Sequence, residues 1–199
     1  MFGPDISELI HRCTEVRSQH GAHLSMTETR TVPCEFARFA ELIRQIHIGL
    51  LTSLDAGGLL HTRPIETLEV DAQDPALWFF TDRRSAKADE LQWDMRVSLG
   101  YSEPSERIYV AVSGVATLLH DSQRARQLWK PEQLAFYPDG PEDERLAILK
   151  VQVRRAEYWI APGRAAYRYA AATAAATGTP VSVLGENQKI SARPSPSGS

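Results

Sequence analysis

The segment from Leu77 to Lys87 combines residue types that can bind a phosphate group. Its apolar, aromatic beginning is typical of a buried strand, and Thr81 to Arg84 form the polar exit of that strand. Ser85 stands where the N-cap of a following helix belongs, and Lys87 lies in the first turn of that helix. A strand that leads into a helix N-terminus offers unpaired N–H groups and the positive end of the helix dipole. With a hydroxyl and an ammonium added, the segment predicts a phosphorylated cofactor.

Composition limits the classes of protein to consider. The 199 residues are 43% hydrophobic and 24% charged, as in an ordinary soluble globular protein. The net charge of −3 gives no reason to propose a nucleic-acid surface. No stretch approaches the roughly 20 apolar residues that a membrane-spanning helix requires. Residues 1–24 carry charges throughout and lack the apolar block of a signal peptide, so we expect a cytoplasmic location.

The cysteines and histidines do not predict a metal site. Cys13 and Cys34 are not spaced like metal ligands and are interpreted as free thiols, with a disulfide as the alternative. The six histidines form no spaced ligand set such as HExxH: His11, His20, His23, His47, His61 and His120.

The hydrophobic pattern predicts six strands and four helices. Apolar residues recur at helical spacing after Pro33, at Phe36, Phe39, Ala40 and Ile43. Further helices are expected at 86–94, 122–129 and 167–177, and strands at 47–54, 59–70, 77–81, 97–101, 107–120 and 146–160.

Glycines mark the points where this chain turns or bends. Asp55 to Gly58 has the chemistry of a hairpin turn, and Gly178 is a natural stop for the last helix. Gly114 lies inside a predicted strand and indicates a bulge or a close backbone approach. Hairpins join many of the strands, and closing such a sheet removes its edges, so we expect a mainly β (α+β) barrel with peripheral helices. A Rossmann fold fits poorly, because there is no GxGxxG and strands and helices do not alternate regularly.

Several short segments stand in a recognisable order between about residues 35 and 160. They are Gly49-Leu50-Leu51-Thr52 with the Gly57-Gly58 turn, His61-Thr62-Arg63-Pro64-Ile65, Leu77-Trp78-Phe79-Phe80-Thr81 with Ser85-Ala86-Lys87, Arg96-Val97-Ser98-Leu99-Gly100-Tyr101-Ser102, Tyr109-Val110-Ala111-Val112-Ser113-Gly114, Leu128-Trp129 and Ala156-Glu157-Tyr158-Trp159. No single segment is specific. The ordered set resembles the general stress protein branch of the pyridoxamine 5′-phosphate oxidase-like family, the FMN-binding split barrels.

The resemblance implies a six-stranded split β-barrel that binds FMN at the interface of a homodimer. Arg63 and Lys87 would pair with the FMN phosphate, helped by Ser85. An arginine fork, a lysine point charge and a serine hydroxyl all suit phosphate oxygens. The chain would divide into a loosely ordered N-terminal extension (1–33), the FMN-binding domain (34–162), a C-terminal helical segment packing on the barrel or the dimer (163–190) and a disordered tail (191–199).

The same resemblance assigns residues to the rest of the flavin. Thr81 and Phe80 would line the ribityl chain and the ring, and the backbone of Pro64 and Ile65 would lie beside the isoalloxazine. Tyr109 stands where the oxidase proper usually has a glutamine that reaches from the partner subunit. Trp159 corresponds to the tryptophan of the oxidase's phenylalanine-tryptophan pair near the flavin.

Each of these residues also has a purely structural interpretation. Arg63 can be a solvated strand residue, and the basic residues before Lys87 can form an ordinary loop. Tyr109 can pack on the sheet, and the tryptophans can fill the core or an interface: Trp78, Trp129 and Trp159. His61 is interpreted as a hydrogen-bonded strand residue rather than a catalyst.

The substrate residues of the oxidase proper are not reproduced. Its Arg-Leu-His-Asp-Arg segment corresponds here to residues 161–168, which hold no histidine and only Arg164 and Arg168 as partial substitutes. We therefore expect an FMN-binding general stress protein, a flavin-dependent oxidoreductase of unknown substrate, rather than a true pyridoxamine 5′-phosphate oxidase. The alternative is a non-catalytic flavin-binding stress protein that acts as a reserve, sensor or scavenger. A haem-binding split barrel ranks third, because no histidine suggests an axial ligand.

Overall fold

The computed structural model describes residues 34–179 and 186–191. The predicted N-terminal extension, Cys13 and the tail after Ser191 lie outside these residues. The strands are β1 (Ile48–Leu54), β2 (Leu60–Glu66), β3 (Glu69–Asp71), β4 (Ala76–Asp82), β5 (Arg96–Glu103), β6 (Ile108–Leu119), β7 (Leu146–Ile160) and β8 (Glu186–Ser191). The helices are α2 (Cys34–Ile46), α3 (Ala86–Trp93), α4 (Ser122–Leu128) and α5 (Arg164–Thr177), with 3₁₀ turns η1 (Pro131–Ala135) and η2 (Gly140–Glu142).

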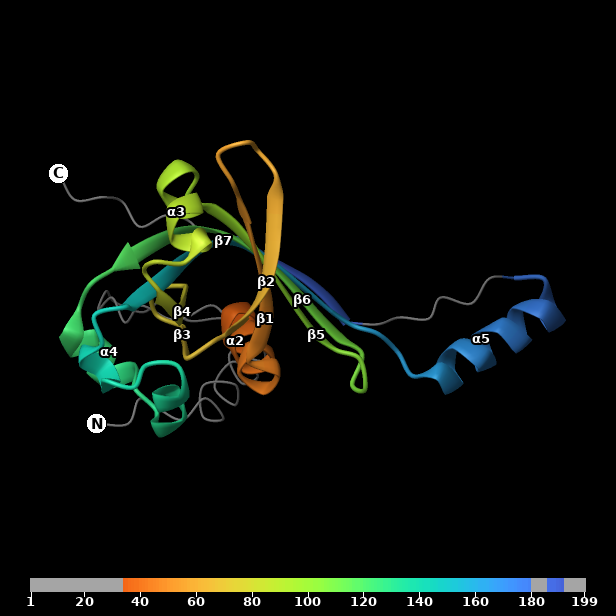
Figure 1. Cartoon of the computed structure of the whole chain (residues 1–199). Helices are drawn as coiled ribbons and strands as arrows, with labels where there is room; N and C mark the ends of the chain where they lie inside the picture. The colour runs from red at the N-terminus through yellow and green to blue at the C-terminus, as the bar shows by residue number, and fades with distance from the viewer. Residues whose placement is uncertain (1–33, 180–185, 192–199) are drawn as a thin grey trace, which may run out of the picture.

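All the strands join one antiparallel sheet, in the order β2-β1-β5-β6-β7-β4-β3, with β8 also paired to β7. The first half of β7 pairs with β4 and its second half with β8, while β6 runs along its whole length. The ladder between β6 and β7 shifts register between Ser113 and Gly114, at the predicted bulge. The mainly β split-barrel class is thus confirmed, and Figure 1 shows the sheet curving around α2.

The prediction of six strands was wrong, since the described residues contain eight. The expected strand 59–70 is broken into β2, which pairs with β1, and β3, which pairs with β4. Between them the N–H of Thr67 donates to the carbonyl of His47 and that of Leu68 to the carbonyl of Trp78. At this point the chain therefore stops pairing with β1 and begins to pair with β4. β8 escaped prediction because its Glu-Asn-Gln-Lys beginning carries no apolar alternation.

Two apolar clusters hold the fold together. The larger lies between the concave side of the sheet and α2, whose Phe36, Phe39, Leu42 and Ile43 are almost fully buried. The smaller lies on the other side of β4, under α4 and the 3₁₀ turns. Because β4 is covered on both faces, its side chains form a continuous apolar run rather than an alternating one.

The predicted C-terminal helix is present and ends as expected. Gly178 follows α5 with φ of 67°, a left-handed conformation that glycine adopts at little cost. Figure 1 shows α5 projecting away from the sheet, so its packing on a second copy stays a prediction. Among the residues described, no helix is long and apolar enough to cross a membrane.

Gly114 has little room for a side chain. A Cβ at this position would lie 2.6 Å from the carbonyl oxygen of Gln152 and 2.7 Å from Val151 Cγ1. We expect Gly114→Ala to lower the free energy of unfolding by about 1–3 kcal/mol, because the backbone of β7 must move. Urea unfolding measures this, with Thr117→Ala, at an exposed position of the same strand, as the control. Equal stability of the two variants would contradict the close approach.

Candidate functional site

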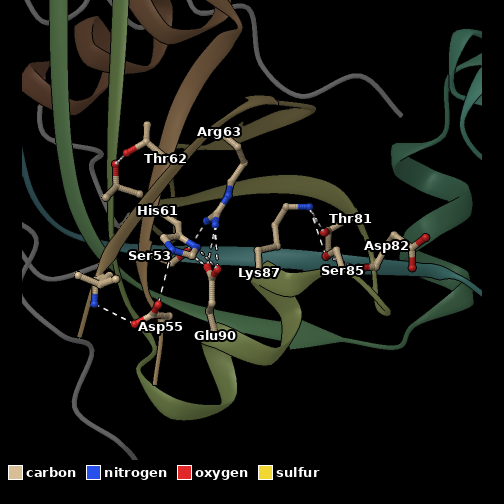
Figure 2. Close-up of polar contacts among 12 residues, drawn as sticks. Ser53, Asp55, His61, Thr62, Arg63, Thr81, Asp82, Ser85, Lys87 and Glu90 are labelled. Carbon is tan, nitrogen blue, oxygen red and sulfur yellow. Dashed lines mark hydrogen bonds and ion pairs between the residues drawn. The ribbon is translucent and has the colours of Figure 1, made fainter. Parts of the chain in front are cut away.

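The residues predicted to bind the FMN phosphate gather, with Thr81 from the predicted ribityl-lining pair, where β2, the end of β4 and the start of α3 meet (Figure 2). Arg63 comes from β2, Thr81 from β4 and Lys87 from α3. Ser85 occupies the N-cap position of α3 and Lys87 its first turn, as the sequence predicts. β2 and β4 are not neighbours in the sheet order, so only the folded chain brings Arg63 to Thr81, Ser85 and Lys87.

The Lys87 ammonium is held between two hydroxyl groups. Its Nζ donates to Thr81 Oγ1 at 2.7 Å and reaches Ser85 Oγ at 3.5 Å. Ser85 Oγ donates to the carbonyl of Asp82 and does not cap the helix. Burial, and next the positive charge of Arg63, hold the pKa of Lys87 below its usual value. Two cations that disfavour one another in partial burial form a position that an anion would stabilise.

The Arg63 guanidinium is bound to groups that the sequence analysis did not single out. Its Nη1 donates to Ser53 Oγ, and its Nη2 donates to both carboxylate oxygens of Glu90, at 2.8 and 3.1 Å. Burial would raise the pKa of Glu90, but hydrogen bonds from Ser53 and Arg63, together with the charge of Arg63, lower it. Glu90 is therefore a buried, ionised carboxylate, 5% exposed.

His61 belongs to the same network. Its Nδ1 lies 2.9 Å from Glu90 Oε1, and its Nε2 lies 3.5 Å from Asp55 Oδ2. These contacts agree with the interpretation of His61 as a hydrogen-bonded strand residue. Ser53 and His61 are register partners in the β1–β2 hairpin, which places them on one face of the sheet.

Sequence reasoning missed Glu90, although two weak signals existed. Glu90 stands three residues after Lys87, so both side chains lie on neighbouring positions of α3. On β1 the buried position after Leu51 is a serine, Ser53, which interrupts the inward apolar face. A polar residue at a buried strand position requires a partner, but nothing in the sequence says which residue supplies it.

The ring of Phe80 lies apart from the predicted phosphate-binding residues. Its ring belongs to the smaller apolar cluster, with the ring centroids of Trp129 at 5.9 Å and Tyr137 at 6.2 Å. Successive side chains of a strand point to opposite faces, so the ring of Phe80 points away from the hydroxyl of Thr81. The structure does not bring this ring to Lys87.

The other predicted residues lie on or under the outward face of the sheet. Tyr109 and Trp159 are register partners on β6 and β7, and are 42% and 37% exposed. Pro64 is exposed opposite Leu50, whereas Ile65 is buried in the core. Arg63 points to the inner side with Ser53, so in one chain Tyr109 and Trp159 face away from it.

Two hollows of the described chain lie apart from this cluster. One, of about 450 Å³, is lined by residues of α2, the β2–β3 connection and Lys130. The other, of about 270 Å³, lies between α4 and the residues around Glu142. Neither is lined by Arg63, Lys87 or Glu90. Within the described residues, no group of acidic, histidine and cysteine side chains is arranged to hold a metal ion.

The antiparallel split-barrel fold places the chain in a structural class, and sequence comparison identifies the family. The family model described as pyridoxamine 5′-phosphate oxidase like matches residues 35–181. The chain therefore belongs to the pyridoxamine 5′-phosphate oxidase-like family. A curated relative, Protein bli-3 of Neurospora crassa, is 26% identical over 120 residues, which cover 56% of this chain and 57% of that protein. The chain thus matches little more than half the length of this relative.

Solved structures with the same fold carry general stress names. A protein of Clostridium acetobutylicum related to general stress protein 26 aligns with a TM-score of 0.56 and 18% identity, over 63% of this chain and 87% of that one. General stress protein 26 of Bacillus anthracis aligns with 0.53 and 20%, over 61% and 93%. A protein of Xanthomonas citri named general stress FMN/FAD binding protein aligns with 0.53 and 25%, over 62% and 86%.

The placement of Lys87 predicts a cost in stability for the chain without ligand. Its lowered pKa means that folding disfavours the charged form, so the ammonium destabilises the fold at neutral pH. We expect Lys87→Met to raise the free energy of unfolding by about 0.5–2 kcal/mol at pH 7. The gain should shrink as the pH rises through the lowered pKa, towards pH values near 10.

Urea unfolding of the ligand-free protein at pH 7 and near pH 10 measures this effect. Lys130→Met, at a half-exposed lysine outside the cluster, is the matched control and should change stability little. If Lys87→Met is less stable than the unsubstituted protein at pH 7, the ammonium of Lys87 does not destabilise the ligand-free fold and the prediction is wrong.

Proposed function

We propose that this chain is an FMN-binding general stress protein that acts as a homodimer, with the FMN phosphate bound by Arg63, Lys87, Ser85 and Thr81. The observation that carries the proposal is the meeting of two partly buried cations beside two hydroxyls, at the N-terminal turn of α3. This donor set fits a phosphomonoester, which accepts charge-assisted hydrogen bonds on three oxygens. The name of the Xanthomonas citri protein, 25% identical, also supports a flavin.

The outward face of the sheet supports the proposed homodimer. Pro64, Leu50, Gly100 and Ala111 follow one another across β2, β1, β5 and β6, and all are exposed. Ile48, 53% exposed, stands on the same side of β1, so this row across the face is apolar, with polar residues such as Ser98 and Ser102 beside it. Such a face suits close contact with its own copy across a two-fold axis.

A dimer through this face would bring Tyr109 and Trp159 of one copy to the flavin of the other. Both stand on the outward side, facing away from Arg63 of their own chain. Phe80 would then contribute through its backbone, since its ring packs with Trp129. Pro64 and Ile65 follow Arg63 directly, so their backbone would lie beside the ring system once Arg63 holds the phosphate.

The bound flavin would supply hydride acceptance and electron transfer, and this chain's residues would supply binding and orientation. We propose a flavin-dependent oxidoreductase that is not a true pyridoxamine 5′-phosphate oxidase, since residues 161–168 hold no histidine. The alternative is a non-catalytic flavin-binding stress protein. Steady-state reduction of the bound flavin by NADH or NADPH separates them, because only an oxidoreductase turns over.

Phosphate recognition is tested by comparing FMN with riboflavin in fluorescence titrations of the apo-protein. We expect FMN to bind more tightly, and Lys87→Ala to weaken FMN binding about 10- to 100-fold through loss of a charge-assisted hydrogen bond. Lys130→Ala is the control, because Lys130 lines the 450 Å³ hollow instead. Equal affinity for the two flavins, or a loss confined to Lys130→Ala, would place the flavin elsewhere.

The dimer is tested at the centre of the outward face. We expect the protein to sediment at about twice its 22.2 kDa mass at micromolar concentration, and Ala111→Arg to yield monomers because it places a charge in an apolar contact. Ala135→Arg makes the same exchange at an exposed position of η1 and should leave the dimer intact. A clean monomer that binds FMN would overturn this architecture.

A further inference from the structure

Glu90 lies on the same helix as Lys87, below the Arg63 guanidinium in Figure 2, and it has three partners. Ser53 donates to its Oε2, Arg63 donates to both of its oxygens, and His61 Nδ1 lies 2.9 Å from its Oε1. Figure 2 shows the Arg63 guanidinium pointing at Glu90, while the Lys87 side chain points away towards Thr81 and Ser85. Each cation of the cluster therefore has its own resident partner.

We propose that Glu90 is a built-in counter-anion that competes with the ligand's phosphate for Arg63 and thereby sets the affinity of the site for phosphate. The inference rests on the proposed function, because it assumes that Arg63 and Lys87 meet the FMN phosphate. Under this proposal Glu90 weakens phosphate binding, whereas Arg63 and Lys87 strengthen it.

The geometry of Arg63 leaves only part of its guanidinium for a ligand. A guanidinium presents five N–H donors, and here both terminal nitrogens already donate to Ser53 and Glu90. A phosphate that takes the same fork must share these donors with Glu90 or displace it. The ligand would also meet the negative charge of Glu90 at close range.

Burial makes this competition strong. Glu90 is 5% exposed and the Arg63 side chain is 22% exposed, so water screens their interaction poorly. Glu90 cancels one of the two positive charges of the cluster, which leaves Lys87 as the source of net attraction. The site would then hold FMN without the full strength of two free cations.

A different role for Glu90 predicts the opposite result. If Glu90 served to hold Arg63 in position for the phosphate, removing its charge would disorder the guanidinium and weaken binding. The two roles are therefore separated by the sign of the change in FMN affinity.

The test is Glu90→Gln, which keeps the size of the side chain and removes the charge. We expect the dissociation constant for FMN to fall about 10-fold, and that for riboflavin to change less than about twofold, because riboflavin carries no phosphate. Asp89→Asn makes the same charge change one residue earlier on α3, at an exposed position, and should have little effect. Unchanged or weaker FMN binding by Glu90→Gln overturns the proposal.

A second comparison avoids a variant with an unpaired buried arginine, which can impair folding. In Arg63→Gln the carboxylate remains, whereas Arg63→Gln/Glu90→Gln has neither charge. We expect the two to bind FMN within about threefold of each other, because competition for Arg63 cannot occur where Arg63 is absent. A gain as large as that of Glu90→Gln in the otherwise unsubstituted protein would show that Glu90 acts by general repulsion, and would refute the competition. If the unsubstituted protein does not distinguish FMN from riboflavin, the proposed function itself fails.

Discussion

The long pairing between β6 and β7 is the constraint on which the rest of the structure depends. The first half of β7 pairs with β4. After β4 the chain continues through Ser85 into α3, which holds Lys87 and Glu90. On its other side β6 pairs with β5. β5 in turn pairs with β1 of the β1–β2 hairpin, which holds Arg63. The two arms meet on the curved sheet of Figure 1, and the ladder between β6 and β7 shifts register at Gly114.

The electrostatics of the site follow from the positions in which the fold places Arg63 and Lys87. Arg63 and Lys87 lie in partial burial, where like charges are costly unless compensated. Glu90, Ser53 and Thr81 are their partners within the chain, while burial, and next the charge of Arg63, hold the pKa of Lys87 below its usual value. A site of this kind gives up some stability of the empty fold and gains affinity for an anion.

The outward face of the sheet carries apolar side chains that remain exposed to solvent in a single chain. Small residues such as Gly100 and Ala111 leave it flat, while Leu50, Tyr109 and Trp159 leave it apolar. Strands in the middle of a sheet seldom leave such a face to water, because the apolar area remains unburied. Arg63 points to the inner side of the sheet and the aromatic side chains of Tyr109 and Trp159 stand on its outer side, so the proposed dimer would link the two halves of the proposed site.

Sequence by itself determined what depends on neighbours in the chain. The apolar run of β4, the helix start at Ser85 with Lys87 and the stop at Gly178 are local, and the ordered motifs placed the chain in its family. Tertiary structure decided which distant groups meet. It joined Glu90 to Arg63 and turned the Phe80 ring away from Thr81, because long-range pairing and the two-sided burial of β4 set those contacts. The polar β8 likewise becomes a strand only because β7 offers it an edge.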